Sequence, residues 1–402
     1  MSPKTLTFTQ TFDAAATEVY RAFTNGTTMR GWLCDACQVV PHPHGRLYLY
    51  WNDGYYANGE FISLELPSKV VFSWRGRTDP GETQITLTIT AQDGISQLAI
   101  EHSGFGDTPE WERTFSEIER GWQVALENLK SVLETGQDLR FTRRPMLGIT
   151  LSDFDAAIAQ KLGVPVNEGI RLDGVMEGMG AQAAGLQKND VIVGLAGQDA
   201  SDYNSFIAII QSHRAGDKIE VVFYRGPEKK SVLMELSPRP MPEVPATQIA
   251  LAEAVGKQDA ECETGLDKFL AEIIEAEASV PPAPGEWSVK GVLAHLIHSE
   301  GYWQTMITEA VIGQEAYYDD YTANLQARVE ATLAVYPTIA ELRAALHRAM
   351  METVQLIAHL PAEFITHKRS YWQLAYNCVQ YNTHFFGHLE QMKAAVAAAR
   401  KS

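Results

Sequence analysis

The sequence has few cysteines, a shortage of basic side chains and no long apolar run. Only 4 cysteines occur in 402 residues, too few for a dense disulfide framework, so we expect a reducing compartment. The 33 Lys and Arg residues are outnumbered by 50 Asp and Glu residues, which gives a formal net charge of −17. This charge repels polyanions and anionic lipid surfaces, so it argues against nucleic acid as a partner.

The sequence also lacks a segment that would carry it into or across a membrane. No stretch approaches the roughly 20 apolar residues that a membrane helix needs. The N-terminal segment MSPKTLTFTQTF alternates polar and apolar residues, and it lacks the basic flank and continuous apolar run of a secretory signal. These absences predict a cytoplasmic protein without a membrane partner.

The chain is too long for a single ordinary core, because domains usually split beyond roughly 250 to 300 residues. The pattern of apolar and polar residues changes twice along the chain, so we expect a multidomain protein. An α+β domain is expected over residues 1–138, a mostly-β domain over 143–240 and an all-α four-helix bundle over 246–400. The proline-rich stretch SPRPMPEVP separates the last two, since no helix can cross it.

The first segment combines strands with one long helix. Apolar periodicity predicts two helices, over 14–24 and 111–134. It predicts strands over 45–51, 56–66, 69–76, 84–90 and 97–102, after a first strand over 5–12. A strand meander followed by a terminal helix indicates an α+β fold.

This order of elements resembles the SRPBCC superfamily of START-like domains. The resemblance is to the branch named for activators of a heat-shock-protein ATPase, and it rests on Tyr20, Phe23, Trp32, Gly59, Trp74 and Gly121-Trp122. It implies a helix-grip fold, in which a curved antiparallel sheet wraps a long helix and leaves a cavity for a small hydrophobic ligand. Because the fold does not fix function, we infer no chaperone activation from it.

Aromatic side chains agree with such a cavity, because they supply more apolar surface than a small sheet needs for closure. The predicted cavity residues are Trp51, Tyr56, Phe72, Trp74 and Trp122. The alternative is that these rings only fill the core, since aromatic residues in strands usually pack there.

A second cluster in this segment has the residue types of a zinc site. Cys34, Cys37, His42 and His44 lie within eleven residues, and zinc favours such ligands. Only one Cys-x-x-Cys pair is present, and its spacing matches no zinc ribbon. We therefore favour ordinary thiols and a polar loop over a metal or redox site.

The second segment resembles a PDZ domain of the bacterial protease-associated type. The motifs are AGL at 184–186, NDVI at 189–192 and RAGD at 214–217, which precedes a strand over 218–224. Asn189 departs from the glycine that relatives commonly carry there. A further strand is expected over 191–195 and a short helix over 204–213.

The PDZ resemblance implies a groove for a protein C-terminal peptide, which adds a strand to an exposed sheet edge. The implied groove residues are Met146, Leu147, Gly148, Ile149, Phe206 and Ile210. The alternative is that these residues only join the domain to its neighbours as a spacer.

The third segment has helical periodicity over 249–277, 288–312, 338–360 and 371–400, separated by prolines. Four long helices predict an antiparallel bundle. The second predicted helix contains His295, and the last contains the motif HFFGHLEQ over 384–391. Histidines at positions i and i+4 share one helical face and can bind one ion.

These motifs resemble the DinB superfamily, whose bundles hold a metal with one histidine of the second helix and a His-x-x-x-His pair of the last. The resemblance implies that His295, His384 and His388 bind a divalent ion, zinc or nickel. His298 could replace a ligand or support one. Some relatives have lost metal or activity, so a bundle that only binds or dimerises is the alternative.

The leading hypothesis for function is a metal-dependent enzyme of the DinB type. It would transfer a low-molecular-weight thiol onto an electrophile, or isomerise a thiol adduct, because a metal lowers the pKa of a bound thiol. The rival is a non-enzymatic adaptor that senses an apolar ligand, captures a protein C-terminus and forms a homodimer through its bundle. Proteolysis is not expected, because no nucleophile constellation accompanies the PDZ segment.

Overall fold

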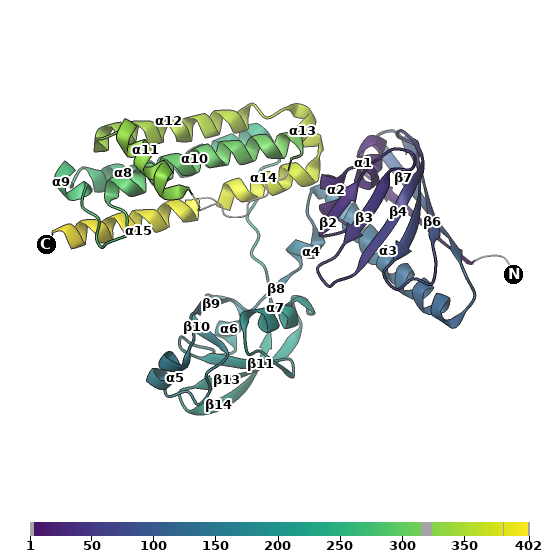
Figure 1. Ribbon diagram of the computed structural model, residues 1–402, viewed down its shortest axis with the longest axis horizontal. Coiled ribbons are helices and arrows are strands. Elements are labelled where there is room, and N and C mark those ends of the chain that lie inside the picture. Colours follow the sequence, from purple (N-terminus) through teal and green to yellow (C-terminus); the bar gives the residue numbers. More distant parts are fainter. Residues whose placement is uncertain (1–3, 315–323, 381, 401–402) are drawn as a thin grey trace. The chain divides into compact units, whose positions relative to one another are not determined.

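The computed structural model describes residues 4–314, 324–380 and 382–400 (Figure 1). The chain forms two compact units. The larger unit joins Met1–Gln137 with Pro242–Ser402, and the smaller unit is Asp138–Met241. An α/β region comes first along the chain, a β-rich PDZ region second and a helical region third, which confirms the predicted multidomain fold class.

A seven-stranded antiparallel sheet forms the first part of the larger unit, in the order β1-β7-β6-β5-β4-β3-β2. The strands are β1 (Lys4–Phe12), β2 (Ala36–Val39), β3 (Arg46–Tyr50), β4 (Tyr56–Glu65), β5 (Lys69–Gly76), β6 (Thr83–Gln92) and β7 (Ile95–Phe105). Two short helices, α1 (Ala16–Thr24) and α2 (Gly26–Arg30), connect β1 to β2. The alternation of buried and exposed residues along β6 and β7 gives the sheet one face that packs and one that does not.

The long helix α3 (Pro109–Thr135) packs on the sheet (Figure 1). Its buried residues recur every three or four positions, as in Trp122, Leu126 and Leu129, so one stripe faces the core. A proline in its first turn and Gly136 after its last turn, with φ +79°, define its ends. The helix and sheet therefore share a single hydrophobic core.

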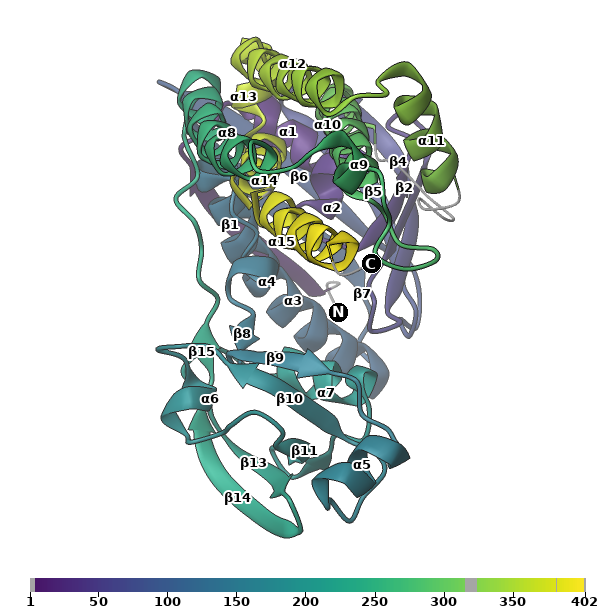
Figure 2. The same cartoon turned by 90° about the vertical axis from the view of Figure 1, so that its left-hand side faces the viewer.

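The smaller unit has a main sheet in the order β14-β13-β11-β10-β9, with β12 beside β11. Its strands are β8 (Pro145–Met146), β9 (Ile149–Ser152), β10 (Ile170–Val175), β11 (Val191–Leu195), β12 (Gln198–Asp199), β13 (Lys218–Arg225), β14 (Glu228–Glu235) and β15 (Ser237–Pro238). Its helices are α4 (Leu139–Thr142), α5 (Ala156–Leu162), α6 (Gly180–Ala183) and α7 (Tyr203–Gln211). A separate ladder pairs β8 with β15 (Figure 2), so the chain enters and leaves this fold at neighbouring points.

Helices form the second part of the larger unit. The long ones are α8 (Gln248–Leu270), α10 (Val289–Ile312), α12 (Ile339–Ala358), α14 (Lys368–Gln380) and α15 (Asn382–Ala399). The shorter ones are α9 (Glu275–Ala278), α11 (Leu325–Val335) and α13 (Ala362–Thr366). The last predicted helix is thus described as two helices, and residue 381 between them lies outside the described residues.

Helix starts follow the capping residues in the sequence. The Ser288 side chain accepts a hydrogen bond from the Gly291 amide at the start of α10, and Thr338 forms a capping box with Glu341 at the start of α12.

Among the residues that the structure describes, no helix has both the length and the hydropathy needed to cross a membrane.

Candidate functional site

Three histidines meet inside the helical region. His295 lies on α10, and His384 and His388 lie one turn apart on α15. The Nε2 atom of His384 is 3.4 Å from Nε2 of His295 and 3.0 Å from Nε2 of His388. The three rings therefore direct the same atom toward a common point.

The separations between these nitrogens suit one bound metal ion. An ion held tetrahedrally at the usual zinc–nitrogen distance would keep its nitrogen ligands about 3.3 Å apart. The measured separations of 3.0 and 3.4 Å bracket that value. Within the described part of the chain, these residues form the one group of three or more His, Cys, Asp or Glu residues with metal-ligand spacing.

Burial favours the neutral form of two of these imidazoles, and the neutral form is the one that binds metals. It lowers the pKa of His295 to about 4, with a further contribution from the neighbouring His388 and His384. Burial also lowers the pKa of His384, and His388 adds to the effect. At neutral pH both rings are therefore uncharged and retain a nitrogen lone pair for an ion.

Two neighbouring side chains orient the cluster. Nδ1 of His388 lies 2.8 Å from Oε1 of Gln391, and because a carbonyl oxygen only accepts, Nδ1 must carry the proton and Nε2 the lone pair. The Trp287 ring lies 4.7 Å from the His295 ring at an interplanar angle of 32°. Gln391 ends the HFFGHLEQ motif, and Trp287 directly precedes the second predicted helix, but the sequence assigns neither residue a role.

His298 is close to the cluster in sequence but is not one of its members. Its Nδ1 atom is buried without a hydrogen-bond partner among the described residues. Burial lowers its pKa, and the nearby Arg328 lowers it further. A role as substitute or supporting ligand stays a prediction.

The predicted peptide groove lies at one edge of the smaller unit's sheet. Among the residues that the structure describes, strand β9, which begins at Ile149, pairs only with β10 in that sheet. The loop before it turns at Gly148, which has φ +78° and whose added Cβ would lie 2.3 Å from the Met179 side chain. Within the described residues, the amides of Leu147 and Gly148 donate to no protein acceptor, while the two carbonyls accept from Ala181 and Met176.

The other groove residues lie near this loop. Phe206 and Ile210, both on α7, are only 4% and 7% exposed, and they share a core with Leu147, against which Ile149 packs. Met146 ends the short strand β8, where it pairs with Ser237. The structure thus brings Leu147, Ile149, Phe206 and Ile210 into one apolar cluster beside the edge strand, whereas Met146 lies outside it.

The predicted cavity aromatics take two kinds of position in the first part of the larger unit. Phe72 and Trp122 are buried in its core, and Trp51 and Trp74 pack against that core with their rings 6.4 Å apart. Tyr56 instead stacks on Tyr48 at 6.1 Å. A ligand cavity among them stays a prediction.

A buried row of hydrogen bonds, which was not predicted from the sequence, crosses the same core. Trp122 Nε1 donates to Nδ1 of His102 at 3.1 Å, so Nε2 of His102 bears the proton and donates to Thr83 Oγ1 at 2.8 Å. Thr83 in turn donates to the carbonyl oxygen of Trp74 at 3.0 Å. Burial lowers the pKa of His102 to about 3. The sequence feature that could have indicated this row of hydrogen bonds is a histidine on the apolar face of a strand.

The cysteine–histidine cluster of this region is not assembled as a metal site. Cys34 is buried, and Cys37 Sγ lies 3.3 Å from the Gly26 carbonyl oxygen. Nδ1 of His42 lies 2.9 Å from the carbonyl oxygen of Pro43. With His44, these residues form no group with metal-ligand spacing among the described residues.

Three family models match successive parts of the chain. Residues 13–134 match "Activator of Hsp90 ATPase homolog 1-like protein", residues 145–236 match "PDZ domain" and residues 258–392 match "DinB superfamily". The three predicted resemblances are thereby confirmed, in the predicted order.

Two curated relatives match the PDZ region. The chain is 30% identical over 108 residues to a "Probable periplasmic serine protease do/HhoA-like" of Haemophilus influenzae, which covers 27% of this chain and 22% of that protein. It is 25% identical over 97 residues to a "Probable periplasmic serine endoprotease DegP-like" of Marinomonas sp., with 24% and 21% covered. The chain thus spans about a fifth of the length of these relatives.

Two solved structures are similar to part of the chain at low sequence identity. An HSP90 activator from Plasmodium falciparum is 20% identical; the match covers 32% of this chain and 95% of the activator chain, with a TM-score of 0.28. The Aha1 dimer from Colwellia psychrerythraea is 16% identical and covers 33% and 96%, with a TM-score of 0.30.

Proposed function

We propose that this chain is a metal-dependent enzyme of the DinB type, in which His295, His384 and His388 hold a zinc or nickel ion. The observation that carries the proposal is the convergence of their three Nε2 atoms. When bound, the ion would lower the pKa of a low-molecular-weight thiol, so that the thiolate attacks an electrophile or isomerises an adduct.

The chain's own residues have defined parts in this proposal. Three neutral imidazoles leave a coordination position open for the thiol. Gln391 keeps the proton of His388 on Nδ1, so Nε2 stays available. Trp287 covers one face of the His295 ring and limits the access of water to it.

The first test is elemental analysis of tag-free protein after incubation with zinc or nickel. The natural chain should carry about one ion, and His384→Ala combined with His388→Ala should carry essentially none. The matched control is His359→Ala, an exposed histidine of the same helical region, which should keep its metal. If the natural chain binds neither metal, the enzyme proposal is wrong.

The activity test follows consumption of a small thiol with a halodinitrobenzene. Turnover should be lost on chelation and restored by the metal, because the ion activates the thiol. Turnover that survives complete metal removal would show that the reaction does not use this site.

A second proposed function is the capture of a protein C-terminus by the PDZ region. It is supported by the two unpartnered amides of Leu147 and Gly148 beside the open edge of β9. Such amides can receive a terminal carboxylate while the peptide extends the sheet. The apolar cluster around Phe206 and Ile210 would contact the last side chain of the peptide.

A pair of glycines offers a matched test of this groove. An added Cβ at Gly148 meets Met179, whereas one at Gly178, with a similar φ of +75°, meets nothing within 4 Å. A peptide with an apolar C-terminus should bind Gly178→Ala but not Gly148→Ala, and amidation of its carboxylate should abolish binding. Equal binding of the free and amidated peptides would rule out carboxylate recognition.

The remaining predictions complete the proposal. The first domain would hold a small hydrophobic ligand among its aromatic residues, and we place the chain in the cytoplasm. If the metal test fails and the peptide test succeeds, the non-enzymatic adaptor with a homodimeric bundle becomes the better description. Sedimentation of the full chain over a range of concentrations tests that homodimer.

A further inference from the structure

A serine hydroxyl lies beside the three histidines. Ser299 follows His295 by one turn of α10, and its side chain is half-buried. Its Oγ atom is 3.5 Å from Nε2 of His295, the same nitrogen that lies 3.4 Å from Nε2 of His384. The ligand atoms of a tetrahedral ion are about 3.3 Å apart. Ser299 Oγ therefore lies about as far from this nitrogen as an atom bound to the same ion would.

The single proton of this hydroxyl is used within the helix. Ser299 Oγ donates to the carbonyl oxygen of His295 at 3.0 Å, as hydroxyls in helices often do. Nε2 of His295 needs its lone pair to bind an ion, so that nitrogen carries no proton either. Two atoms that bear lone pairs thus lie 3.5 Å apart with no hydrogen between them. Such a pair favours a positive ion or a hydrogen-bond donor beside it.

The chemistry of a serine hydroxyl decides which part it can take at a metal site. Zinc in proteins takes cysteine, histidine and carboxylate ligands, so a neutral hydroxyl is better suited to a hydrogen bond with the molecule that the ion holds. It can accept from a water molecule, and rotation about its C–O bond lets it donate to an anion. A hydrogen bond to an anion is stronger than one to a neutral carbonyl oxygen. A bound thiolate should therefore draw the Ser299 proton away from His295.

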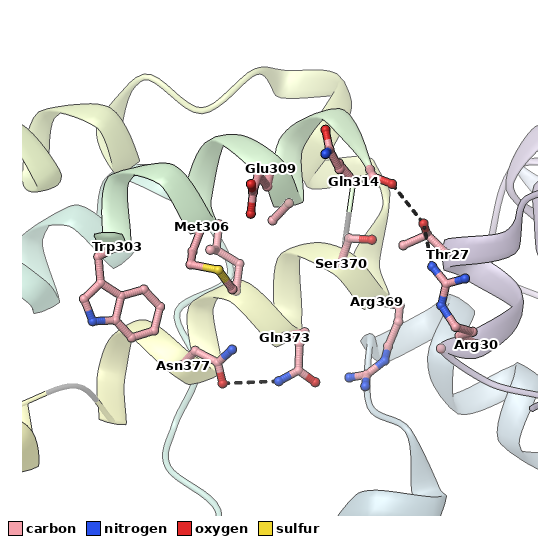
Figure 3. Close-up of a pocket in the computed structure, with 14 residues that line it drawn as sticks. Thr27, Arg30, Trp303, Met306, Glu309, Gln314, Arg369, Ser370, Gln373 and Asn377 are labelled. Atoms are coloured by element: carbon pink, nitrogen blue, oxygen red, sulfur yellow. Dashed lines mark hydrogen bonds between the residues drawn. The ribbon is translucent and has the colours of Figure 1, made fainter. Parts of the chain in front are cut away.

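The same face of α10 leads from the histidines to a cavity. His295, Ser299 and Trp303 are spaced four residues apart, so their side chains follow one face of the helix. Trp303 lies at one end of a cavity of about 430 Å³, which is lined by residues of α2, α10 and α14 (Figure 3). Ser299 thus lies between the cluster and this cavity along α10. A molecule that reached from the cavity to the ion would pass its hydroxyl.

We propose that Ser299 positions the sulfur of the bound thiol by donating a hydrogen bond to it. The inference rests on the proposed metal chemistry and adds a residue that contacts the substrate. The thiol releases its proton to solvent as its sulfur joins the ion. The Ser299 proton then turns from the carbonyl oxygen of His295 to the thiolate, so the hydroxyl both orients the sulfur and stabilises its negative charge.

Cobalt(II) is the probe ion, because its absorption bands report the atoms bound to it. The full chain is loaded with cobalt and titrated with 2-mercaptoethanol, which should produce a sulfur-to-cobalt charge-transfer band. Ser299→Ala should still bind about one cobalt ion, because the three histidines remain. It should bind the thiol about tenfold more weakly or worse, since a hydrogen bond to a charged group is lost. Its band should lie at longer wavelength, because the sulfur electrons are no longer stabilised by the hydroxyl.

Matched variants isolate the hydroxyl from the shape of the side chain. Ser299→Thr keeps the hydroxyl and should bind the thiol like the natural chain, whereas Ser299→Val has nearly the same shape and should bind it like Ser299→Ala. The threonine and valine pair decides the matter if Ser299→Ala does not fold. Thr305→Ala is the control, because the Thr305 hydroxyl also donates to a carbonyl oxygen one turn back, that of Gly301 at 3.0 Å. This variant should leave the thiol affinity and the band unchanged.

The outcomes distinguish this inference from the function on which it rests. Equal thiol affinities and band positions in the natural, Ser299→Thr and Ser299→Val chains overturn the role of Ser299 and leave the metal chemistry standing. A natural chain that takes up no cobalt, or that takes up cobalt without a sulfur band, contradicts the proposed thiol chemistry, and the role of Ser299 is then wrong as well.

Discussion

A single histidine and a cluster of three histidines, all in the larger unit, show how differently a protein can use the imidazole ring. Both nitrogens of His102 have protein partners, so its tautomer is fixed and its hydrogen-bonding capacity is used up. The cluster of His295, His384 and His388 instead turns three Nε2 atoms toward one another, and Nδ1 of His295 is buried without a hydrogen-bond partner among the described residues. A ring with complete partners stabilises a fold, whereas converging lone pairs suit a cation.

The largest expected effect is the loss of metal from the cluster. His295→Ala should weaken zinc or nickel binding by more than about 100-fold, since removing a supporting residue alone costs 10- to 100-fold. Competition with a chromogenic chelator measures this change. His298→Ala is the matched variant one turn further along α10, and because His298 is outside the three-histidine group it should cost no more than the roughly 10-fold of a weakly supporting residue. A larger loss in His298→Ala would exchange the roles of the two residues.

Replacement of His102, the histidine whose two nitrogens both have protein partners, should lower the stability of the fold and leave metal binding unchanged. His102→Ala leaves Trp122 Nε1 and Thr83 Oγ1 without their partner in a buried place. The cost should be roughly 2 to 4 kcal/mol of unfolding free energy, from unsatisfied polar groups and an empty space. Denaturant unfolding measures it. Near-native stability would show that this row of hydrogen bonds is dispensable.

Lowering the pH should further separate the structural role of His102 from the role of the histidine cluster. Because burial lowers the pKa of His102 to about 3, the unfolded chain binds a proton more readily than the folded one below the ordinary pKa of 6.5. The stability linked to this residue is therefore complete above pH 6.5 and declines by up to about 1.4 kcal/mol per pH unit toward pH 3. A His102→Phe variant should lose this part of the pH slope. Identical slopes in both proteins would contradict the assignment.

The smallest expected effect concerns the residue that orients the cluster. Gln391→Leu removes the acceptor for Nδ1 of His388 but keeps the ligand. Metal affinity should fall by about 10-fold, at the lower end of the range for supporting residues. Gln391→Glu should retain or increase affinity, because a carboxylate also accepts from Nδ1. A loss in both variants would indicate a packing role.

Periodic segments could be predicted from the sequence with close bounds. Strand β5 (Lys69–Gly76) and strand β11 (Val191–Leu195) begin and end where apolar runs predict. Strand β2 (Ala36–Val39) and helix α2 (Gly26–Arg30) were missed, because elements of four or five residues carry too little periodicity.

The candidate site could be predicted only in part. His384 and His388 share a helix face by their spacing, and the DinB resemblance adds His295. The hydrogen bond from His388 to Gln391 depends on side-chain conformations, which spacing does not determine. The cavity lined by α2, α10 and α14 was not predictable, because residues such as Arg30 and Arg369, which are 339 positions apart in the sequence, come to line it only through the packing of these helices.

The paired strands β8 and β15 place both ends of the smaller unit side by side. The larger unit is therefore discontinuous along the chain, and its first part is synthesised well before the helices that complete it. A module whose ends adjoin can be gained, exchanged or lost by recombination without breaking the fold that surrounds it. In this architecture, the smaller unit can be replaced as a whole while the larger unit is inherited unchanged.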